Sequence, residues 1–201
     1  MLDGRITVGG PLAVPVTPDY VANDAALRAF VAQEATSVTY HLVHLSLSLR
    51  NESGTPPLET VDLELTLSSP SLPEPQAWSM MPKQIIDESQ VTTNVQLDPQ
   101  LHLFGVGGSL GSAGQSTVEQ AHEVFLEALN ELGGNPAWHF KRTRRMDLRG
   151  CHRLIMVLRA PRHATTDVYI VVRASVEIGR RGLRRRYYAE LPNPLVVVAT
   201  I

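Results

Sequence analysis

The chain has 201 residues, of which 43% are hydrophobic and 19% are charged. This composition is typical of a globular protein with one substantial core, and it excludes a chain that is disordered throughout. A single cysteine, Cys151, excludes an internal disulfide framework and a multi-cysteine zinc site. The first residues lack the pattern of a secretory signal, and no segment reaches the roughly 18 apolar residues of a membrane helix. We therefore expect a cytoplasmic protein without a transmembrane segment.

The net charge of −2 hides a strong asymmetry along the chain. Residues 1–136 contain four basic and sixteen acidic side chains, a net charge of −12, whereas residues 137–201 contain fourteen basic and four acidic ones, a net charge of +10. Such a distribution favours an anionic partner or association between subunits, unless the two parts interleave in one fold and neutralise each other.

Two arginine-rich clusters carry most of the positive charge, and their guanidinium groups are candidate sites for an anion or a protein partner. They consist of Arg142, Arg144 and Arg145, and of Arg184, Arg185 and Arg186. The sequence pI of about 6.4 and the lack of any nucleic-acid-binding motif argue against nucleic acid as the partner. An acidic polymer or an anionic membrane surface remains an alternative partner.

The N-terminal residues 1–18 are rich in glycine and proline, which predicts an extended arm. Asn23 is placed to cap a short helix over residues 24–34. In residues 38–49, apolar side chains alternate with polar ones, and the alternation changes phase between Leu42 and Val43. The alternation predicts a strand with one buried face, and the phase change predicts a β-bulge.

Further segments with strand patterns follow along the chain, separated by turns rich in glycine and proline. The clearest are residues 61–67, 91–97, 138–140, 154–158, 168–178 and 195–201. The segment 154–158 is apolar on both faces, which indicates a central strand. Short strands without regular β–α alternation favour antiparallel sheets.

One segment has the pattern of an amphipathic helix instead. Apolar residues recur at three- and four-residue steps over residues 117–132, Ser116 and Glu119 fit a capping box, and Gly133 and Gly134 follow. The preceding residues 105–114 are dense in glycine, and the sequence leaves open whether they form a loop or a strand.

These patterns predict a mainly β protein: an antiparallel β-sandwich of immunoglobulin-like or related topology, with an amphipathic helix at about 117–132 and a short N-terminal helix. The predicted organisation is an N-terminal arm, residues 1–18, and one sandwich domain over residues 19–201.

Catalytic motifs are sparse. Residues 107–111 match the G-x-S-x-G pattern of the hydrolase nucleophile elbow, which would make Ser109 a nucleophile, with His163 or His152 as its base and Asp147 or Asp167 as its orienting acid. The β–α units that present such an elbow are missing from the pattern, and the predicted helix begins too far after the serine. The seven histidines show no metal-ligand spacing, so we predict neither a metal nor a cofactor.

The sequence therefore favours a non-enzymatic protein–protein interaction or assembly module, including a self-associating structural subunit. The alternatives are a serine hydrolase that uses Ser109, and a module that binds an anionic polymer or membrane surface through its arginines.

Overall fold

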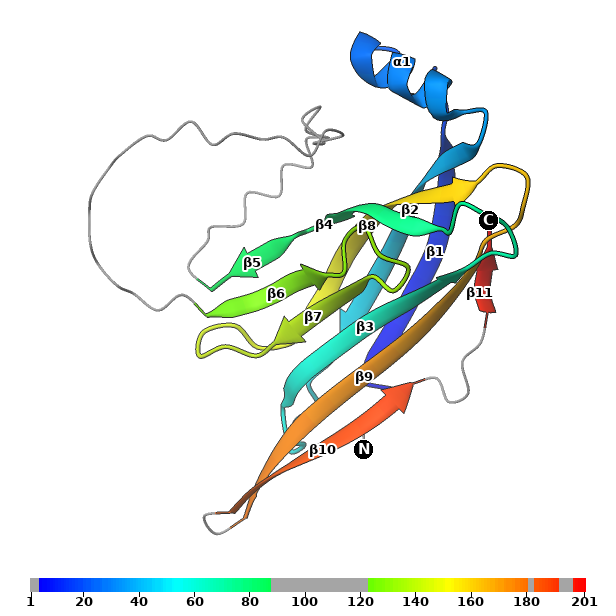
Figure 1. The fold of residues 1–201 in the computed structure, drawn as a ribbon. Helices are drawn as coiled ribbons and strands as arrows, with labels where there is room; N and C mark the ends of the chain where they lie inside the picture. Colours follow the sequence, from blue (N-terminus) through cyan, green and yellow to red (C-terminus); the bar gives the residue numbers. More distant parts are fainter. Residues whose placement is uncertain (1–3, 88–122, 181–182, 192–196) are drawn as a thin grey trace, which may run out of the picture.

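The computed structural model describes residues 4–87, 123–180, 183–191 and 197–201. The described part of the protein is mainly β, and two antiparallel sheets pack against each other (Figure 1). This confirms the predicted fold class of a β-sandwich with a helix. The helix that the structure describes is the short N-terminal one, α1 (Ala25–Glu34), and its ten residues are too few to span a membrane.

The smaller sheet has four strands. In spatial order they are β1 (Ile6–Val16), β2 (Val38–Leu49), β8 (Gly150–Pro161) and β4 (Gln76–Met81). The predicted arm is thus in large part a strand of the body, because Ile6–Val16 pairs with β2 of the same chain.

The larger sheet has seven strands. Six follow the order β10 (Leu183–Leu191), β9 (Asp167–Arg180), β3 (Leu58–Ser68), β7 (Ala137–Lys141), β6 (Val124–Leu129) and β5 (Gln84–Ile86). The seventh strand, β11 (Val197–Thr200), pairs with the first residues of β9. It lies along the same edge of β9 as β10, which pairs with the later residues of β9.

Period-two alternation places the core between the two sheets. The larger sheet contributes Leu63 and Trp138, both fully buried, and the smaller sheet contributes Leu47, Leu154 and Met156. On β3 the outward residues are Thr60, Asp62, Glu64 and Thr66, all polar or charged, which explains the alternation seen in this part of the sequence.

The phase change at Leu42 and Val43 has a different cause from the predicted bulge. β2 pairs with β8 residue by residue along its whole length, without a shift. Val43 belongs to the sandwich core, whereas Tyr40 faces the opposite side, where its ring lies 5.9 Å from that of Phe30 on α1. The strand changes its buried face because α1 covers one end of it. The register shift lies in β1, between Gly9 and Leu12.

The predicted helix over residues 117–132 is wrong for its described part. Residues 124–129 form β6, which pairs with β5 and β7, and residues 117–122 lie outside the described ranges. Both Phe125 and Leu126 are buried, and such a run fits a helix stripe as well as a strand covered on two sides. Pairing with β7 decides in favour of the strand. The cap of α1 is Asp24 rather than Asn23, and it accepts from Leu27 N at 2.9 Å.

Candidate functional site

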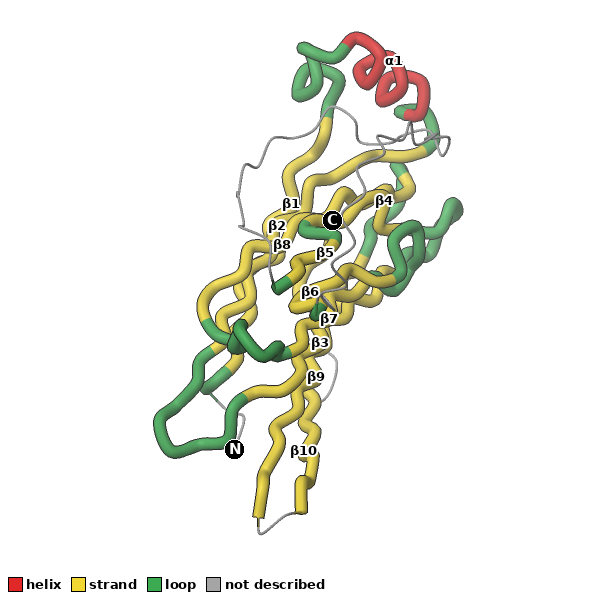
Figure 2. Tube along the Cα trace, turned by 90° about the vertical axis from the view of Figure 1, so that its left-hand side faces the viewer, coloured by secondary structure: helices red, strands yellow, loops and turns green. Residues whose placement is uncertain are grey.

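The hairpin formed by β9 and β10 projects from one end of the sandwich (Figures 1 and 2). β3 pairs with β9 only as far as Val176, which is aligned with Leu58. Among the described strands, the rest of β9 therefore pairs with β10 alone. The second arginine cluster lies on this projecting part, because Arg184–Arg186 are aligned with Gly179–Glu177.

β10 is also an edge of the larger sheet. It is nine residues long, contains no proline, and has no strand on its outer side among those that the structure describes. Tyr187 and Tyr188 are 46% and 70% exposed. Such an edge offers unpaired backbone N–H and C=O groups to another strand.

A row of alternating charges crosses the outer face of the larger sheet as far as β9, and the backbone register aligns its last member there with an acidic residue of this edge. Glu127 on β6 is opposite His139 on β7, His139 is opposite Asp62 on β3, Asp62 is opposite Arg173 on β9, and Arg173 is opposite Glu190 on β10. Each residue faces a neighbour of opposite charge when His139 is protonated, and cross-strand pairs of this kind stabilise a sheet.

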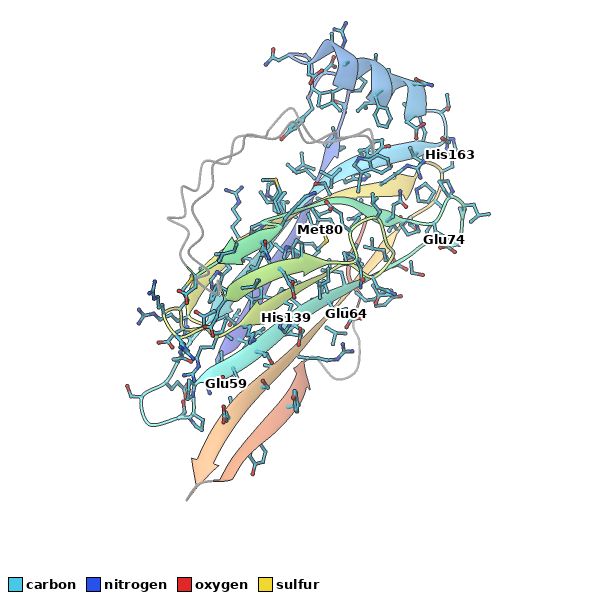
Figure 3. All side chains as sticks on the ribbon, turned by 60° about the vertical axis from the view of Figure 1, so that its left-hand side comes forward. Glu59, Glu64, Glu74, Met80, His139 and His163 are labelled. Atoms are coloured by element: carbon cyan, nitrogen blue, oxygen red, sulfur yellow. The ribbon has the colours of Figure 1, made fainter. Side chains whose placement is uncertain are left out.

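His139 and Asp62 contact each other directly within this row. Nδ1 of His139 lies 2.5 Å from Oδ1 of Asp62. This hydrogen bond raises the pKa of His139 above its usual value, although partial burial acts in the opposite direction. Arg173 forms an ion pair with Glu64, which lies two residues after Asp62 on β3. Figure 3 labels His139 and Glu64 on this sheet.

The acidic and basic parts of the chain interleave in the sandwich. Glu59 pairs with Arg142 at 2.8 Å and Glu34 with Arg159 at 3.1 Å, in addition to the contacts of Asp62 and Glu64 already described. In each pair the acid comes from residues 1–136 and the base from residues 137–201. Internal neutralisation therefore accounts for part of the charge asymmetry.

The members of the first arginine cluster differ in exposure. Arg142 is held by Glu59, while Arg144 and Arg145 are exposed in the loop between β7 and β8. The backbone N–H of Arg144 donates to the Glu123 carboxylate at 2.9 Å. Lys141 and Ser175 are both aligned with Thr60, so this loop and the base of the projecting hairpin lie at the same end of the sheet.

The structure does not bring Asp147 and His163 together. Asp147 precedes β8 and His163 follows it, so the twelve residues of that strand, roughly 40 Å at 3.3 Å per residue, separate them. Ser109 and the glycine-dense segment 105–114 lie outside the described residues. Within the described ranges, no group of three or more His, Cys, Asp or Glu side chains gathers in a way that could hold a metal ion.

The charged row could not be found from motifs. His139, Asp62 and Arg173 are far apart in sequence, and each occupies an ordinary outward position of a strand. The signal was the recurrence of charge at outward positions, but only the strand order and register bring the three residues into line.

No family model matches the sequence, and no curated protein is significantly similar to it. Among solved structures, the membrane-inserted form of the NetB toxin of Clostridium perfringens is similar, with a TM-score of 0.40 and 9% identity over 76% of this chain and 83% of that chain. A pore-forming protein is similar with a TM-score of 0.34 and 7% identity over 94% of this chain and 86% of that chain. Both likenesses are too distant to indicate a shared function.

Proposed function

We propose that this protein is a non-enzymatic assembly module that associates with further copies of itself. The observation that supports the proposal best is the edge strand β10, which runs beyond the body of the sandwich and has no neighbour on its outer side among the described strands. A projecting two-stranded ribbon is only marginally stable in water by itself. Pairing with another chain would stabilise it.

Two further features favour a protein partner. The exposed Tyr187 and Tyr188 lie at the middle of the edge, and tyrosine is enriched at protein–protein interfaces. The sequence of β10 also carries charges of both signs, with Glu190 near one end and Arg184–Arg186 near the other. A partner that carries both signs in the reverse order would match it, and a second copy does so.

Sedimentation velocity over a wide range of protein concentration, at low and at high salt, tests the proposal. We expect a species larger than the monomer that becomes more abundant with concentration and less abundant with salt, because charge pairs contribute to the contact. A variant with Arg184, Arg185 and Arg186 all changed to Ala should remain monomeric at the same concentrations. A wild-type protein that is monomeric under every condition would contradict the proposal.

The two alternatives from the sequence have separate tests. Binding of the arginines to an acidic polymer predicts that heparin retains the wild type longer than the triple Ala variant, and equal retention would exclude it. The serine hydrolase hypothesis predicts labelling by a fluorophosphonate probe that disappears in Ser109→Ala. Labelling that is absent, or that does not depend on Ser109, would exclude that hypothesis.

A further inference from the structure

From the backbone register and the sequence of β10, we infer that two copies of this chain join edge to edge through antiparallel β10 strands, with the two-fold axis at Tyr187. This inference rests on the proposed self-association and specifies its contact. It makes Arg184 of each copy face Glu190 of the other, and the larger sheets of the two copies then form one continuous sheet.

The geometry of antiparallel pairing restricts where the axis can lie. On an edge strand, the N–H and C=O groups of alternate residues point to the free side. When two identical edges pair without a bulge, a residue whose groups point outward must face another such residue. The numbers of two facing residues therefore differ by an even amount. The axis consequently passes through a residue of β10 and never between two residues.

Among axes that pass through a residue, the positions of the arginines decide which registers place like charges opposite each other. With the axis at Arg185, that residue faces its own copy and Arg184 faces Arg186. With the axis at Arg186, that residue again faces its own copy. Like charges directly opposite each other destabilise a sheet, so both registers are disfavoured. With the axis at Tyr188, Arg186 faces Glu190, but only the seven residues 185–191 pair, two fewer than with the axis at Tyr187.

An axis at Tyr187 passes through a residue, as the pairing geometry requires, and it places no two like charges opposite each other. All nine residues of Leu183–Leu191 pair, and no arginine lies directly opposite an arginine. Leu183 faces Leu191, Arg184 faces Glu190, and Arg186 faces Tyr188, whose exposed ring is a suitable partner for a guanidinium group. Each of these pairs occurs twice because of the symmetry.

The charged row on the outer face supports the same register. Within one copy the backbone register aligns Arg173 on β9, the last member of the row, with Glu190. On its other side, Glu190 has no neighbouring strand among those described. The proposed contact places Arg184 of the second copy there. Arg184 is itself opposite Gly179, so the register gives it no charged cross-strand neighbour within its own hairpin. The alternation of charge thus continues across the contact.

Charge reversal with mixing tests the register. Arg184→Glu places two carboxylates opposite each other at both ends of the contact, and Glu190→Arg places two guanidinium groups there. Each variant alone should raise the dissociation constant of the dimer by roughly tenfold or more, given the energies of cross-strand charge pairs. An equimolar mixture should restore association, because positions 184 and 190 are then both acidic in one variant and both basic in the other, so that every facing pair in the mixed dimer has opposite charges.

Arg185→Glu is the matched control, since it changes the net charge by the same amount on the adjacent residue but faces Ala189 of the second copy. We expect only a slight weakening of the dimer. Equal weakening by Arg184→Glu and Arg185→Glu, or a mixture that fails to associate, would overturn the register while leaving self-association intact. A wild type that never dimerises would instead overturn the proposed function.

Cross-linking gives a second and independent measurement. In a Cys151→Ser background, Tyr187→Cys places two thiols directly opposite each other at the axis, at a separation that oxidation can bridge. Tyr188→Cys is the control, because its thiol faces Arg186 of the second copy. We expect oxidation to yield a covalent dimer much faster for Tyr187→Cys than for Tyr188→Cys. Equal rates for the two variants would contradict an axis at Tyr187.

Discussion

His139 and Asp62 face each other across β7 and β3, with Nδ1 of the imidazole 2.5 Å from Oδ1 of the carboxylate. The pair lies in the middle of the charged row, between Glu127 on one side and Arg173 on the other. A protonated His139 has acidic neighbours on both sides, whereas a neutral one leaves Asp62 and Glu127 without a positive charge between them. The protonation state of His139 therefore affects the electrostatic energy of the whole row.

The first prediction concerns the pH dependence of this pair. The hydrogen bond to Asp62 raises the pKa of His139 in the folded protein. The stability contributed by this hydrogen bond is therefore fully present below the pKa of the unfolded chain, about 6.5, and is lost as the pH rises through the pKa of the folded protein. Asp62→Asn should lower the free energy of unfolding more at pH 6 than at pH 9, as measured by urea denaturation. NMR titration should show the pKa of His139 falling in the variant. An equal penalty at both pH values would contradict this account.

His152 should respond to pH with the opposite sign. Its ring lies 5.1 Å from that of Phe140 and 5.7 Å from that of Phe125, and burial lowers its pKa. The folded protein therefore favours the neutral ring. Its stability is greatest above the pKa of His152 in the unfolded chain, and stability is lost as the pH falls through the pKa of His152 in the folded protein. His152→Phe should flatten the loss of unfolding free energy between about pH 7 and pH 5. A slope as steep as that of the wild type would show that His152 does not cause the loss.

The sequence predicted the layered β architecture because period-two alternation depends on local burial alone. It was misleading where a residue's environment comes from distant segments. The alternation of β2 changes phase at Leu42 because α1 covers its far end, and no local pattern distinguishes that from a bulge. Phe125 and Leu126 fit a helix stripe until pairing with β7 is known. The charged row depends wholly on strand order, so its residues could not be predicted as a group.

A third prediction concerns Arg5, whose buried side chain is held by neutral oxygen acceptors. The guanidinium donates to Arg50 O at 3.2 Å, to Pro56 O at 2.9 Å and to Asn51 Oδ1 at 2.9 Å, and so ties the start of the chain to the loop between β2 and β3. Arg5→Met should lower the unfolding free energy by about 2 to 4 kcal/mol, because it removes three hydrogen bonds that a buried charged donor makes to partly buried oxygens.

Arg5→Lys is the control for charge. It keeps the positive charge but cannot reach three acceptors with the planar fork of a guanidinium group. We expect it to recover only part of the stability in urea denaturation. Full recovery would show that charge rather than hydrogen-bond geometry accounts for the contribution of Arg5.

The turn between β6 and β7 holds Leu132 in an unusual backbone conformation. Its φ is +67°, and its side chain is 60% exposed. The conformation allows Leu132 N to donate to Ala77 O at 2.7 Å while Ala77 N donates to Gly133 O at 3.1 Å, so the turn covers part of the free edge of β4. A leucine with positive φ costs about 1 to 2 kcal/mol, which glycine avoids.

Leu132→Gly should therefore raise the unfolding free energy by about 0.5 to 1 kcal/mol, after allowing for the greater flexibility of glycine in the unfolded chain. Leu129→Gly, on the adjacent strand β6, is the comparison and should be destabilising, because glycine weakens a strand. A thermal shift series on the two variants measures both effects. Loss of stability in Leu132→Gly would show that the exposed leucine makes contacts that outweigh its backbone strain.

The last prediction separates the packing of α1 from that of the sandwich core. Phe30, Tyr40 and Trp78 form a cluster of rings with centroids 5.9 to 6.2 Å apart, and Arg159 lies over Trp78 at 6.0 Å while pairing with Glu34. None of these three aromatic residues belongs to the core between the sheets. Phe30→Ala should therefore free the helix locally and leave the sandwich folded.

Hydrogen exchange can resolve the two regions. In Phe30→Ala, the amides of α1 should exchange much faster while those of β3 and β9 change little, and the global unfolding free energy should fall by roughly 1 to 2 kcal/mol, since Phe30 is only partly buried. Phe140→Ala, in the fully buried core, should instead lower the global value by about 3 to 5 kcal/mol. Uniformly faster exchange in Phe30→Ala would show that α1 and the sandwich unfold as one cooperative unit.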